Sequence, residues 1–408
     1  MEEGSQINLE GSLTLGPNDT TFRDHRLDRV HNWYSYVEGF SGNLVRYYLK
    51  KFNIDTTSHV LDPFSGCGTT VVESVLYRTS VTGIDINPFL GFATKVKSNL
   101  DVDTKALRNE IKNFRLFHEG NELEIDVKKY ISDIYLDMDY FSDRVLRKIA
   151  IIKKFIESIG TPEIQDIFRL ALSSILVGIS NMRRGPDLAR RKHIQEDSPV
   201  YEFLIKKLLL MAEDLDYFVG RTYGKANIIT GDAKDKTLFE VDKYNLVITS
   251  PPYLNGTNYL RNTKLELWIL DFLKHDTIKI LRERAVTAGI NDTFTHKNVT
   301  PVSSEVDDLV TKLEQVAYDQ RIPIMVSTYF SDINKVLSNV RNSLKEGGRC
   351  IWVTGDSIFS DIYIPTDLIT MSIARENNLM PEDSFKARSR KSRNGKPLRE
   401  TVITMRAV

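Results

Sequence analysis

Near both ends of the chain, short apolar runs of strand length alternate with stretches in which apolar residues recur at helical spacing. The first apolar run, HVLD at residues 59–62, is followed by a glycine-containing turn, a helical stretch and a second apolar run, SVTGIDI at residues 80–86. A strand, a turn, a helix and a strand in this order are typical of a βαβ unit with parallel strands. This part of the sequence therefore predicts an α/β protein.

The pattern changes between about residues 100 and 224, where long helical stretches follow one another without a convincing strand. The clearest of them begin with a serine or threonine at the N-cap or with a proline in the first turn, as helices commonly do. We interpret this region as a helical insertion within an α/β frame. Its three helices are expected at residues 142–159, from Thr161 to about Gly185, and from Ser198 to about Phe218.

The α/β pattern resumes with the apolar runs NIITGDA and NLVITSPPY, which begin at Asn227 and Asn245. A second helical stretch follows, and then come a helix near 324–344, the strand RCIWVTGD, a helix near 366–378, a basic tract and a last strand, ETVITMR. We expect about seven strands in a doubly wound sheet with two large helical insertions. The expected organisation is a tail at residues 1–22, an α/β frame at 23–99 and 225–408, the first insertion at 100–224 and the second at 259–322.

Composition narrows the class of protein. Lysine plus arginine and aspartate plus glutamate each number 55, so the net charge is zero and a polyanion would have to bind a local basic patch. The histidines and the two cysteines show no metal-ligand spacing, and so few cysteines fit a reducing, cytoplasmic compartment. The N-terminus is acidic, unlike a signal peptide, and the longest apolar run contains Arg169, which favours a buried helix over a membrane span.

Acidic residues follow the carboxyl ends of three expected strands. Asp62 and Asp85 end the first two strands, and Asp232 follows the third. Between the first strand and its helix, Gly66 and Gly68 lie in a tight turn, where missing side chains let the backbone approach a ligand. Open α/β sheets bind ligands in the crevice at this edge, and a carboxylate at the end of the second strand suits the two hydroxyls of a ribose.

The ligand expected in this crevice carries an adenosine and a positively charged end. A P-loop needs a lysine after its second glycine, but Thr69 follows Gly68, and the acidic residues would repel phosphates. A dinucleotide is an alternative, although Asp62 would then lie near the pyrophosphate. S-adenosylmethionine fits the acidic residues better. The structural alternative is an ordinary turn in which the aspartates only cap helices.

A rigid corner, Ser250-Pro251-Pro252-Tyr253, ends the fourth α/β strand. Proline has no N–H and a fixed φ, and it restricts the residue before it, so the chain must leave the sheet here. In a doubly wound sheet this strand is expected beside the first, which places the corner next to the transferable methyl group. The Ser250 hydroxyl and the Pro251 carbonyl would accept the two N–H bonds of a base amine, and Tyr253 would offer a flat face to an extruded base. The alternative is a simple strand-terminating turn.

These motifs resemble those of the S-adenosylmethionine-dependent amino methyltransferases of DNA, which modify cytosine N4 or adenine N6. DPFSGCGTT resembles the cofactor motif of the family, and TSPPY resembles its catalytic motif in the form typical of cytosine-N4 enzymes. Three further stretches, HNWYSYVEGFSGNLV, KEGGRCIWVTGD and KPLRETVITMR, resemble other motifs of the family in the same order. The resemblance covers roughly residues 25–99, 225–260 and 324–406, and implies a Rossmann-like methyltransferase sheet with seven strands.

The resemblance also implies roles for individual residues. Asp85 would bind the ribose, Asp232 the adenine amine, and Phe40 and Ser41 would close over the methionine end. Because the glycine motif precedes the catalytic motif, the first helical insertion between them is the candidate target-recognition region. The implied cofactor-binding residues are Phe40, Ser41, Asp62, Phe64, Gly66, Gly68, Thr69, Asp85 and Asp232, and the implied catalytic residues are Ser250, Pro251, Pro252 and Tyr253.

Two basic tracts are candidate DNA-binding segments, and we interpret both as flexible loops suited to phosphate contacts. The first is NMRRGPDLARRKH at residues 181–193, and the second is FKARSRKSRNGKPLR at residues 385–399. Charge reversal in the second tract is expected to weaken DNA binding and to flatten its salt dependence. Solvated loops without a ligand are the alternative. The candidate residues are Arg183, Arg184, Arg190, Arg191, Arg388, Arg390 and Arg393.

The leading prediction is a sequence-specific methyltransferase that moves a methyl group from S-adenosylmethionine directly to N4 of a flipped cytosine in double-stranded DNA. Such an enzyme would protect host DNA in a restriction-modification system, with a cognate restriction endonuclease as its partner. Adenine-N6 enzymes more often have Asp or Asn in place of Ser250, so adenine N6 is the nearest alternative. An RNA or protein amino methyltransferase and a non-catalytic binding module are further alternatives, and the oligomeric state stays open.

Overall fold

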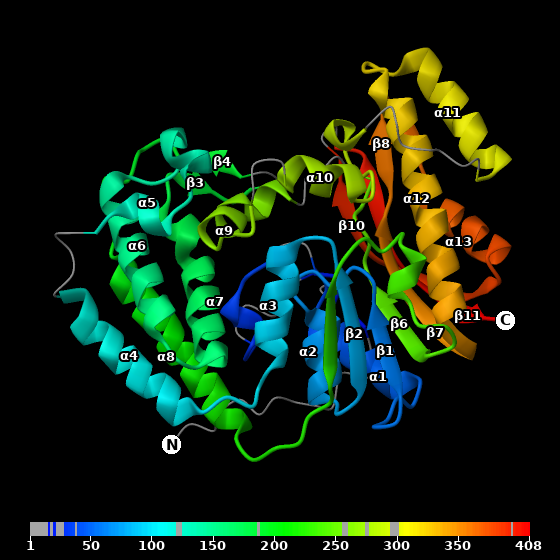
Figure 1. Cartoon of the computed structure of the whole chain (residues 1–408). Helices are drawn as coiled ribbons and strands as arrows, with labels where there is room; N and C mark the ends of the chain where they lie inside the picture. Colours follow the sequence, from blue (N-terminus) through cyan, green and yellow to red (C-terminus); the bar gives the residue numbers. More distant parts are fainter. Residues whose placement is uncertain are drawn as a thin grey trace.

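The computed structural model is an α/β structure built on a central sheet, which has seven strands over the described part of the chain. The strand order β10-β11-β7-β6-β1-β2-β5 confirms the predicted fold class (Figure 1). The structure describes residues 15–16, 19–21, 28–36, 39–119, 125–185, 188–254, 260–273, 277–293, 302–392 and 395–408. The strands of the sheet are β1 (His59–Asp62), β2 (Ser80–Asp85), β5 (Ala226–Thr230), β6 (Tyr244–Thr249), β7 (Leu344–Gly355), β10 (Leu379–Lys391) and β11 (Pro397–Ala407).

Five adjacent strands, from β7 through β6, β1 and β2 to β5, run parallel, and β11 and β10 extend the sheet antiparallel beyond β7. Val60 of β1 lies opposite Leu246 of β6, which confirms the expected adjacency of the first and fourth α/β strands. Because the carboxyl ends of parallel strands meet at one edge of a sheet, the residues that follow β1, β2, β5 and β6 come together there.

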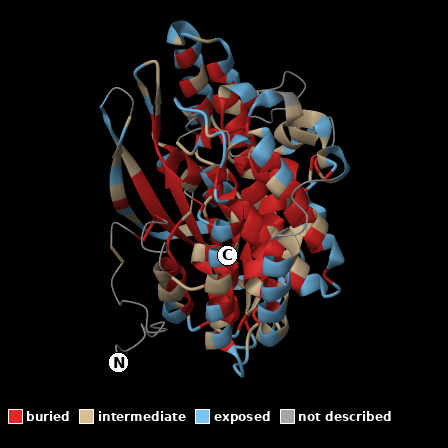
Figure 2. Cartoon of the chain, turned by 90° about the vertical axis from the view of Figure 1, so that its left-hand side faces the viewer, coloured by how far each residue is buried: buried red, intermediate tan, exposed pale blue. Residues whose placement is uncertain are grey.

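Successive residues of the strands contribute to two hydrophobic cores, because side chains alternate between the two faces of a sheet. In β6, Leu246 and Ile248 belong to one core and Val247 belongs to the other. In β7, Ile351 and Trp352 divide in the same way. Buried residues therefore lie on both sides of the sheet, as a sheet covered on both faces requires (Figure 2).

Helices cover both faces of the sheet. α1, α2 and α3 contribute to the first core, and α12 and α13 contribute to the second. The helices expected from the sequence near residues 324–344 and 366–378 are confirmed as α12 and α13. The bounds are α1 (Gly42–Lys51), α2 (Thr69–Leu76), α3 (Pro88–Ser98), α12 (Arg321–Ser343) and α13 (Thr366–Glu376).

The first helical insertion forms a bundle beside α3, on the left of Figure 1, and shares the first core. The three predicted helices are confirmed as α6, α7 and α8, but the sequence analysis did not predict α4. α7 ends at Ile179 rather than near Gly185, because the chain turns there into a short hairpin, β3–β4, that was not expected. The bounds are α4 (Thr104–Glu119), α5 (Val127–Tyr130), η3 (Asp133–Met138), α6 (Asp143–Ser158), α7 (Pro162–Ile179), β3 (Met182–Arg183), β4 (Ala189–Arg190) and α8 (Val200–Phe218).

The second helical insertion contains short helices, two of which, α9 and α10, lie above the carboxyl edge of the parallel strands in Figure 1. None of the helices in the described ranges combines the length and apolar character that crossing a membrane requires. The remaining bounds are η2 (His31–Trp33), η4 (Lys236–Leu238), η5 (Arg261–Thr263), α9 (Lys264–Ile269), α10 (Thr277–Arg284), η6 (Ile290–Asp292), α11 (Ser304–Val316), β8 (Ser357–Phe359) and β9 (Ile362–Ile364).

The interpretation of residues 385–399 as a flexible basic loop was wrong. Residues 385–391 belong to β10, which pairs antiparallel with β11 along its whole length, and β11 itself begins at Pro397. β10 is the edge strand of the sheet, and charged side chains are common on edge strands because they discourage pairing with another chain. Of the basic residues of β10, Lys386 and Lys391 are exposed, whereas Arg388 and Arg390 are partly buried and pair with Glu400.

Candidate active site

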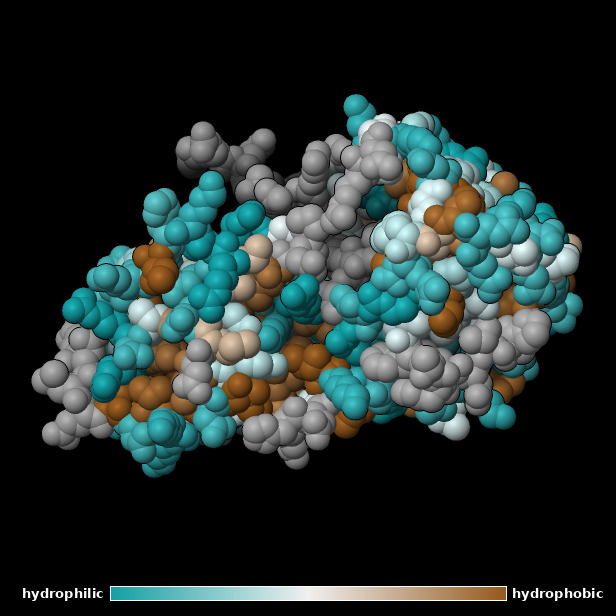
Figure 3. All heavy atoms as spheres, turned by 90° about the horizontal axis from the view of Figure 1, so that it is seen from above, coloured by the Kyte–Doolittle hydropathy of each residue, from teal (hydrophilic) through white to brown (hydrophobic). Residues whose placement is uncertain are grey.

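A cleft opens at the carboxyl edge of the parallel strands, where the turns after β1, β2, β5 and β6 meet. Including its mouth, which is open to solvent, it encloses about 820 Å³ of empty space. Seen from above, the surface is hollowed between the first helical insertion and the side that carries α11 and α12 (Figure 3). The cleft is lined by Tyr36, Pro63, Phe64, Gly66, Asp85, Ile86, Asn87, Leu90, Gly231, Asp232, Ala233, Ser250, Pro252, Leu260, Arg282, Ala285, Val286, Ala288 and Asp292.

The turn after β1 depends on two glycines with positive φ angles, 52° at Gly66 and 88° at Gly68. Gly66 lines the cleft, and its backbone N–H donates to Asp85 Oδ2 at 2.9 Å. Gly68 instead packs against α3, because a Cβ on it would lie 2.8 Å from Cγ2 of Thr94. Only one of the two glycines thus faces the ligand site, and the other lets α2 and α3 approach each other.

Asp85 occupies the position predicted for it, at the end of β2 and in the wall of the cleft. Its two carboxylate oxygens accept hydrogen bonds from the backbone N–H groups of Gly66 and Asn87, at 2.9 and 2.8 Å. Burial nevertheless raises the pKa of Asp85 to about 6. Each carboxylate oxygen can accept more than one hydrogen bond, so Asp85 keeps acceptor capacity for a ligand.

Asp62 lies behind the cleft rather than in its wall. It is 1% exposed, and its Oδ1 accepts from the Thr249 hydroxyl at 2.7 Å and from the Phe64 N–H at 3.1 Å. Burial raises the pKa of Asp62 to about 6, against the hydrogen bonds that lower it. Asp62 therefore ties the end of β1 to the end of β6, one residue before the Ser250 corner begins.

Asp232 lines the opposite part of the cleft, after β5. Its side chain accepts from the N–H of Lys234 at 3.0 Å and forms an ion pair with Lys234 Nζ at 3.1 Å. Lys234 Nζ also donates to the carbonyl of Arg284, which ends α10. This lysine thus connects the turn after β5 to the second helical insertion.

Ser250 and Pro252 of the rigid corner line the same cleft as Asp85 and Asp232. Pro251 is buried, and the Ser250 hydroxyl donates to Tyr253 Oη at 3.2 Å. Burial, and next the nearby Glu400 carboxylate, raise the pKa of Tyr253 above its ordinary value. The tyrosine therefore stays neutral, and its hydroxyl is tied to the serine that faces the cleft.

Three of the predicted cofactor residues also lie outside the cleft lining. Ser41 caps α1 by accepting from the N–H of Leu44 at 3.3 Å, and Phe40 and Thr69 are buried. Tyr36, from the same segment as Phe40, lines the cleft instead. The segment that resembles the family motif therefore reaches the cleft through Tyr36 rather than through Phe40 or Ser41.

Residues 282–292 of the second helical insertion form one wall of the cleft, and this wall was not predicted from the sequence. Arg282 Nε donates to Asp292 Oδ1 at 3.0 Å, and Thr287 donates to Asp332 Oδ2 from its N–H at 3.1 Å and from its hydroxyl at 3.2 Å. No motif in the sequence marks this segment. Asn87, also missed, had a recognisable signal, because Asn before Pro commonly caps a helix.

The chain is similar in sequence to curated proteins of one kind. It is 23% identical to Type II methyltransferase M.BsoBI of Geobacillus stearothermophilus, in an alignment 441 positions long that covers 96% of this chain and 86% of that protein. It is 25% identical to Type II methyltransferase M.MvaI of Kocuria varians over 359 residues, covering 79% and 76%, and 23% identical to M.AvaI of a Nostoc species over 400 residues, covering 89% and 82%. The chain is a homologue of Type II methyltransferases.

No protein-family model matches the chain. Similar solved structures include the rRNA methyltransferase aviRa from Streptomyces viridochromogenes, with a TM-score of 0.34 and 10% identity over 94% of this chain and 92% of that one. They also include TTHA0409, a putative DNA modification methylase from Thermus thermophilus, with a TM-score of 0.22 and 14% identity over 43% and 50% of the two chains.

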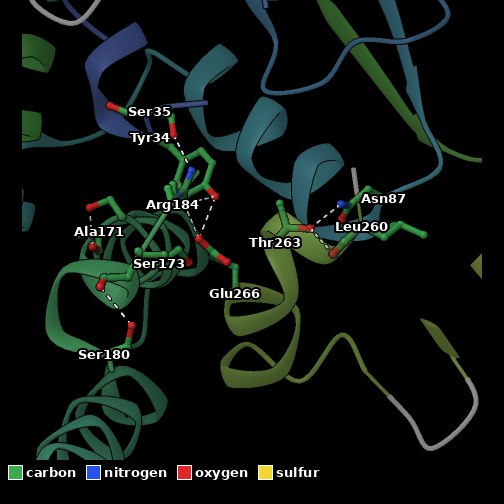
Figure 4. A network of polar contacts seen from close by, with 12 residues as sticks. Tyr34, Ser35, Asn87, Ala171, Ser173, Ser180, Arg184, Leu260, Thr263 and Glu266 are labelled. Atoms are coloured by element: carbon green, nitrogen blue, oxygen red, sulfur yellow. Dashed lines mark hydrogen bonds and ion pairs between the residues drawn. The ribbon is translucent and has the colours of Figure 1, made fainter. Parts of the chain in front are cut away.

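Arg184, a predicted DNA-binding residue, lies in a buried polar network that joins three segments of the chain (Figure 4). Its Nη2 donates to Glu266 Oε1 at 2.6 Å and to Tyr34 Oη at 2.7 Å, and its Nη1 donates to the Ser35 carbonyl at 2.8 Å. Glu266 has no exposed side-chain surface, and burial raises its pKa while Arg184 opposes that shift. The arginine compensates a buried carboxylate, which makes it structural.

The other predicted DNA-binding arginines differ in the contacts that they make within the protein. Arg191 donates to the Met182 carbonyl at 2.9 Å and to carbonyls at the end of α7. Arg190 is exposed but donates to the Met138 carbonyl at 2.6 Å, and Arg183 is exposed. Arg388 forms two hydrogen bonds of 2.9 Å with the buried Glu400. Charge reversal at Arg388 would thus place two carboxylates together, and its effect would not report on DNA alone. Arg390 also pairs with Glu400, and Arg393 lies outside the described residues.

Proposed function

We propose that this protein is an S-adenosylmethionine-dependent DNA methyltransferase that methylates the exocyclic N4 amine of cytosine in double-stranded DNA. The observation that carries the proposal is that Ser250 and Pro252 line the same cleft as Asp85 and Asp232. A corner able to orient an amine thus adjoins residues able to bind an adenosine. The similarity to Type II methyltransferases supports DNA as the substrate and the protection of host DNA, beside a cognate restriction endonuclease, as the biological role.

The residues of the cleft fit S-adenosylmethionine. Asp85 is placed to accept from the two ribose hydroxyls and Asp232 from the adenine amine, and Phe64, Ile86 and Val286 supply apolar walls for the rings. The acidic cleft favours the positively charged end of this cofactor and disfavours phosphates. When bound, the cofactor supplies an electrophilic methyl group on a positively charged sulfur.

The Ser250 corner is suited to activate a weak nucleophile. The lone pair of an exocyclic base amine is delocalised into the ring, so the amine attacks a methyl group slowly. Two acceptors on its N–H bonds would localise the lone pair and orient it, and their fixed position lowers the cost of reaching the reactive geometry. The Ser250 hydroxyl donates its own proton to Tyr253, which leaves the serine oxygen free to accept. The second acceptor, the Pro251 carbonyl, is held in place because Pro251 has a restrained φ and the following Pro252 restricts its ψ.

The target base must leave the duplex to reach this corner. Base-modifying enzymes extrude the nucleotide and stack the base against aromatic or apolar side chains. The half-buried Tyr253 ring adjoins the corner and is the surface proposed for that role. The hollow above the cleft is bordered by the first helical insertion, residues 100–224, which we propose as the target-recognition region (Figure 3).

The choice of cytosine N4 over adenine N6 rests on the resemblance of TSPPY to the catalytic motif of cytosine-N4 enzymes. The test is to incubate the protein with S-adenosylmethionine and mixed genomic DNA, and then to analyse the nucleosides by mass spectrometry. N4-methylcytosine is expected. N6-methyladenine would contradict the assignment of the atom but keep the chemistry, and methylation of RNA or protein with unmodified DNA would contradict the substrate. Cofactor binding without any transfer would indicate a binding module.

A further inference from the structure

The ring of Tyr253 is held against the sheet by an arginine of the edge strand. The guanidinium carbon of Arg390 lies 5.2 Å from the centroid of the Tyr253 ring, within the range of a cation–π contact. Gly355, at the end of β7, leaves the space for this contact. A Cβ at Gly355 would lie 2.1 Å from Arg390 Nη2 and 3.1 Å from Cδ2 of the Tyr253 ring. The three residues therefore meet without room for a methyl group.

Glu400 forms an ion pair with this arginine. It lies on β11, between Arg388 on one side and Gly355 on the other in the register of the sheet. Its side chain is fully buried, binds Arg388 at both oxygens at 2.9 Å, and lies 3.4 Å from Arg390 Nε. A buried carboxylate requires such partners, because a buried charge without one is costly. Glu400 and the two arginines thus form one electrostatic unit beneath Tyr253.

We propose that Arg390, held by Glu400, is a positioning residue that sets the orientation of the Tyr253 ring for the target base. The inference rests on the function proposed above, in which that ring stacks against the extruded base. Because the Ser250 hydroxyl donates to Tyr253 Oη, a displaced ring would also release the serine hydroxyl that faces the cleft. Arg390 would therefore act on the transfer step through Tyr253 and Ser250, without touching the base amine.

The alternative role for Arg390 is a direct contact with a DNA phosphate, as the sequence suggested. The two roles predict different kinetics. A phosphate contact contributes to DNA affinity and to its salt dependence, so its loss raises KM and lowers the salt slope by about 1. A positioning residue acts on the reactive geometry, so its loss lowers kcat, and a misplacement of about 1 Å costs up to about a hundredfold.

The test compares Arg390→Ala with Arg349→Ala, a control matched in several respects. Arg349 also lies on the sheet, pairs with a glutamate of β10, Glu382, at 3.2 Å, and has its guanidinium carbon 5.4 Å from an aromatic ring, that of Phe52. We expect Arg390→Ala to lower kcat by tenfold or more, with the affinity for S-adenosylmethionine and the salt slope of DNA binding changed less than twofold. Arg349→Ala should leave kcat within about twofold of wild type.

Gly355→Ala is a second variant, which keeps the charge of Arg390 and displaces chiefly its guanidinium, because the added Cβ would lie 2.1 Å from Arg390 Nη2 and 3.1 Å from the Tyr253 ring. It should lower kcat in the same way, and crystal structures of both variants should show the Tyr253 ring displaced from its wild-type position. A normal kcat with a raised KM and a lower salt slope in Arg390→Ala would overturn the inference, as would an unmoved Tyr253 ring. The structures remain informative even if the wild type methylates no DNA, which would instead refute the proposed function.

Discussion

At the residue scale, two carboxylates that look equivalent in the sequence have different positions. Asp62 and Asp85 both end parallel strands, and burial raises the pKa of each to about 6. Asp85 lines the cleft, whereas Asp62 is enclosed and holds Thr249 of the neighbouring strand. Asp85 therefore faces the cleft, whereas Asp62 holds the strand that ends at the Ser250 corner.

The enclosed Asp62 predicts a pH-dependent stability. Its folded pKa of about 6 exceeds the ordinary value of 3.8, so its ionisation costs stability as the pH rises between these values. The full cost is on the order of 3 kcal/mol. Asp62→Asn keeps an oxygen that can accept from Thr249 and Phe64 but carries no charge. We expect the variant to gain stability relative to wild type from about pH 4 to pH 6 and to keep that advantage above pH 6.

Denaturant unfolding across this pH range measures the difference, and the contribution of Asp85 cancels because both proteins contain it. Asp55→Asn is the matched control, because hydrogen bonds from Ser58 and Thr57 lower the pKa of this exposed carboxylate. The ionised Asp55 stabilises the folded protein, so this contribution to the free energy of unfolding should be lost as the pH falls. The pH dependence is therefore opposite in sign to that of Asp62. A stability difference between Asp62→Asn and wild type that does not change with pH would contradict the burial argument.

The Arg184–Glu266 pair predicts a loss of stability rather than of DNA affinity. Arg184→Ala would leave Glu266 buried without its cation, which costs about 3–5 kcal/mol. Glu266→Gln in the same chain should restore much of that loss, because it removes the unpaired charge. Arg183→Ala, on the exposed neighbour, should change the free energy of unfolding by less than about 0.5 kcal/mol. Equal, small effects of Arg183→Ala and Arg184→Ala would refute the structural role of Arg184.

At the element scale, the wall formed by residues 282–292 depends on its attachment to α12. Thr287 is fully buried and donates two hydrogen bonds, of 3.1 and 3.2 Å, to Asp332, which is 3% exposed. Breaking a buried hydrogen bond to a charged group costs roughly 1.5–3 kcal/mol. The neighbouring Ala285, Val286 and Ala288 line the cleft, so breaking this hydrogen bond is expected to weaken cofactor binding there.

We therefore predict that Thr287→Val weakens S-adenosylmethionine binding by roughly tenfold, since about 1.4 kcal/mol corresponds to that factor. Isothermal titration calorimetry without DNA measures it. Thr328→Val is the control, because it removes a buried hydroxyl from α12 that donates only to the Ile324 carbonyl at 2.7 Å. Equal affinities for the two variants would show that the wall does not depend on this attachment.

The elements that could be predicted from the sequence are those whose own residues specify them. HVLD, SVTGIDI and NLVIT are apolar because both faces of the sheet are covered, and Ser142 and Pro162 mark the starts of α6 and α7. β10 was misread because it is an edge strand, where charged residues are common, and because its arginines pair with Glu400 of β11, a contact that the tract alone does not reveal. The wall at residues 282–292 was not predicted, because its position depends on the contact of Thr287 with Asp332. These two residues are 45 positions apart, and no local sequence pattern encodes their contact.

At the scale of the whole molecule, a net charge of zero means that DNA must be bound by a local surface. The hollow above the cleft lies beside the first helical insertion, which carries the exposed Arg183 and Arg190 (Figure 3). Arg191, from the same tract, instead donates to backbone carbonyls at the end of α7. Proximity in the sequence thus does not imply a common role.

We predict that Arg183→Ala lowers the slope of log affinity against log salt by about 1, as expected for one lost phosphate contact. Arg191→Ala should leave the slope unchanged and lower the free energy of unfolding. Fluorescence anisotropy with a labelled duplex at several salt concentrations measures the slopes. The reverse result, with the slope changed only in Arg191→Ala, would mean that the arginines that contact DNA have been assigned incorrectly.

The central claim is that the cleft brings a bound methyl donor to the Ser250 corner. The most direct measurement is single-turnover methyl transfer from labelled S-adenosylmethionine to duplex DNA, for wild type and Ser250→Ala, with cofactor affinity determined for both. We predict methyl transfer by wild type and a transfer rate about a hundredfold lower in Ser250→Ala. The two proteins should bind the cofactor with equal affinity, because the serine orients the amine and not the donor. Transfer at the wild-type rate by Ser250→Ala would contradict the account.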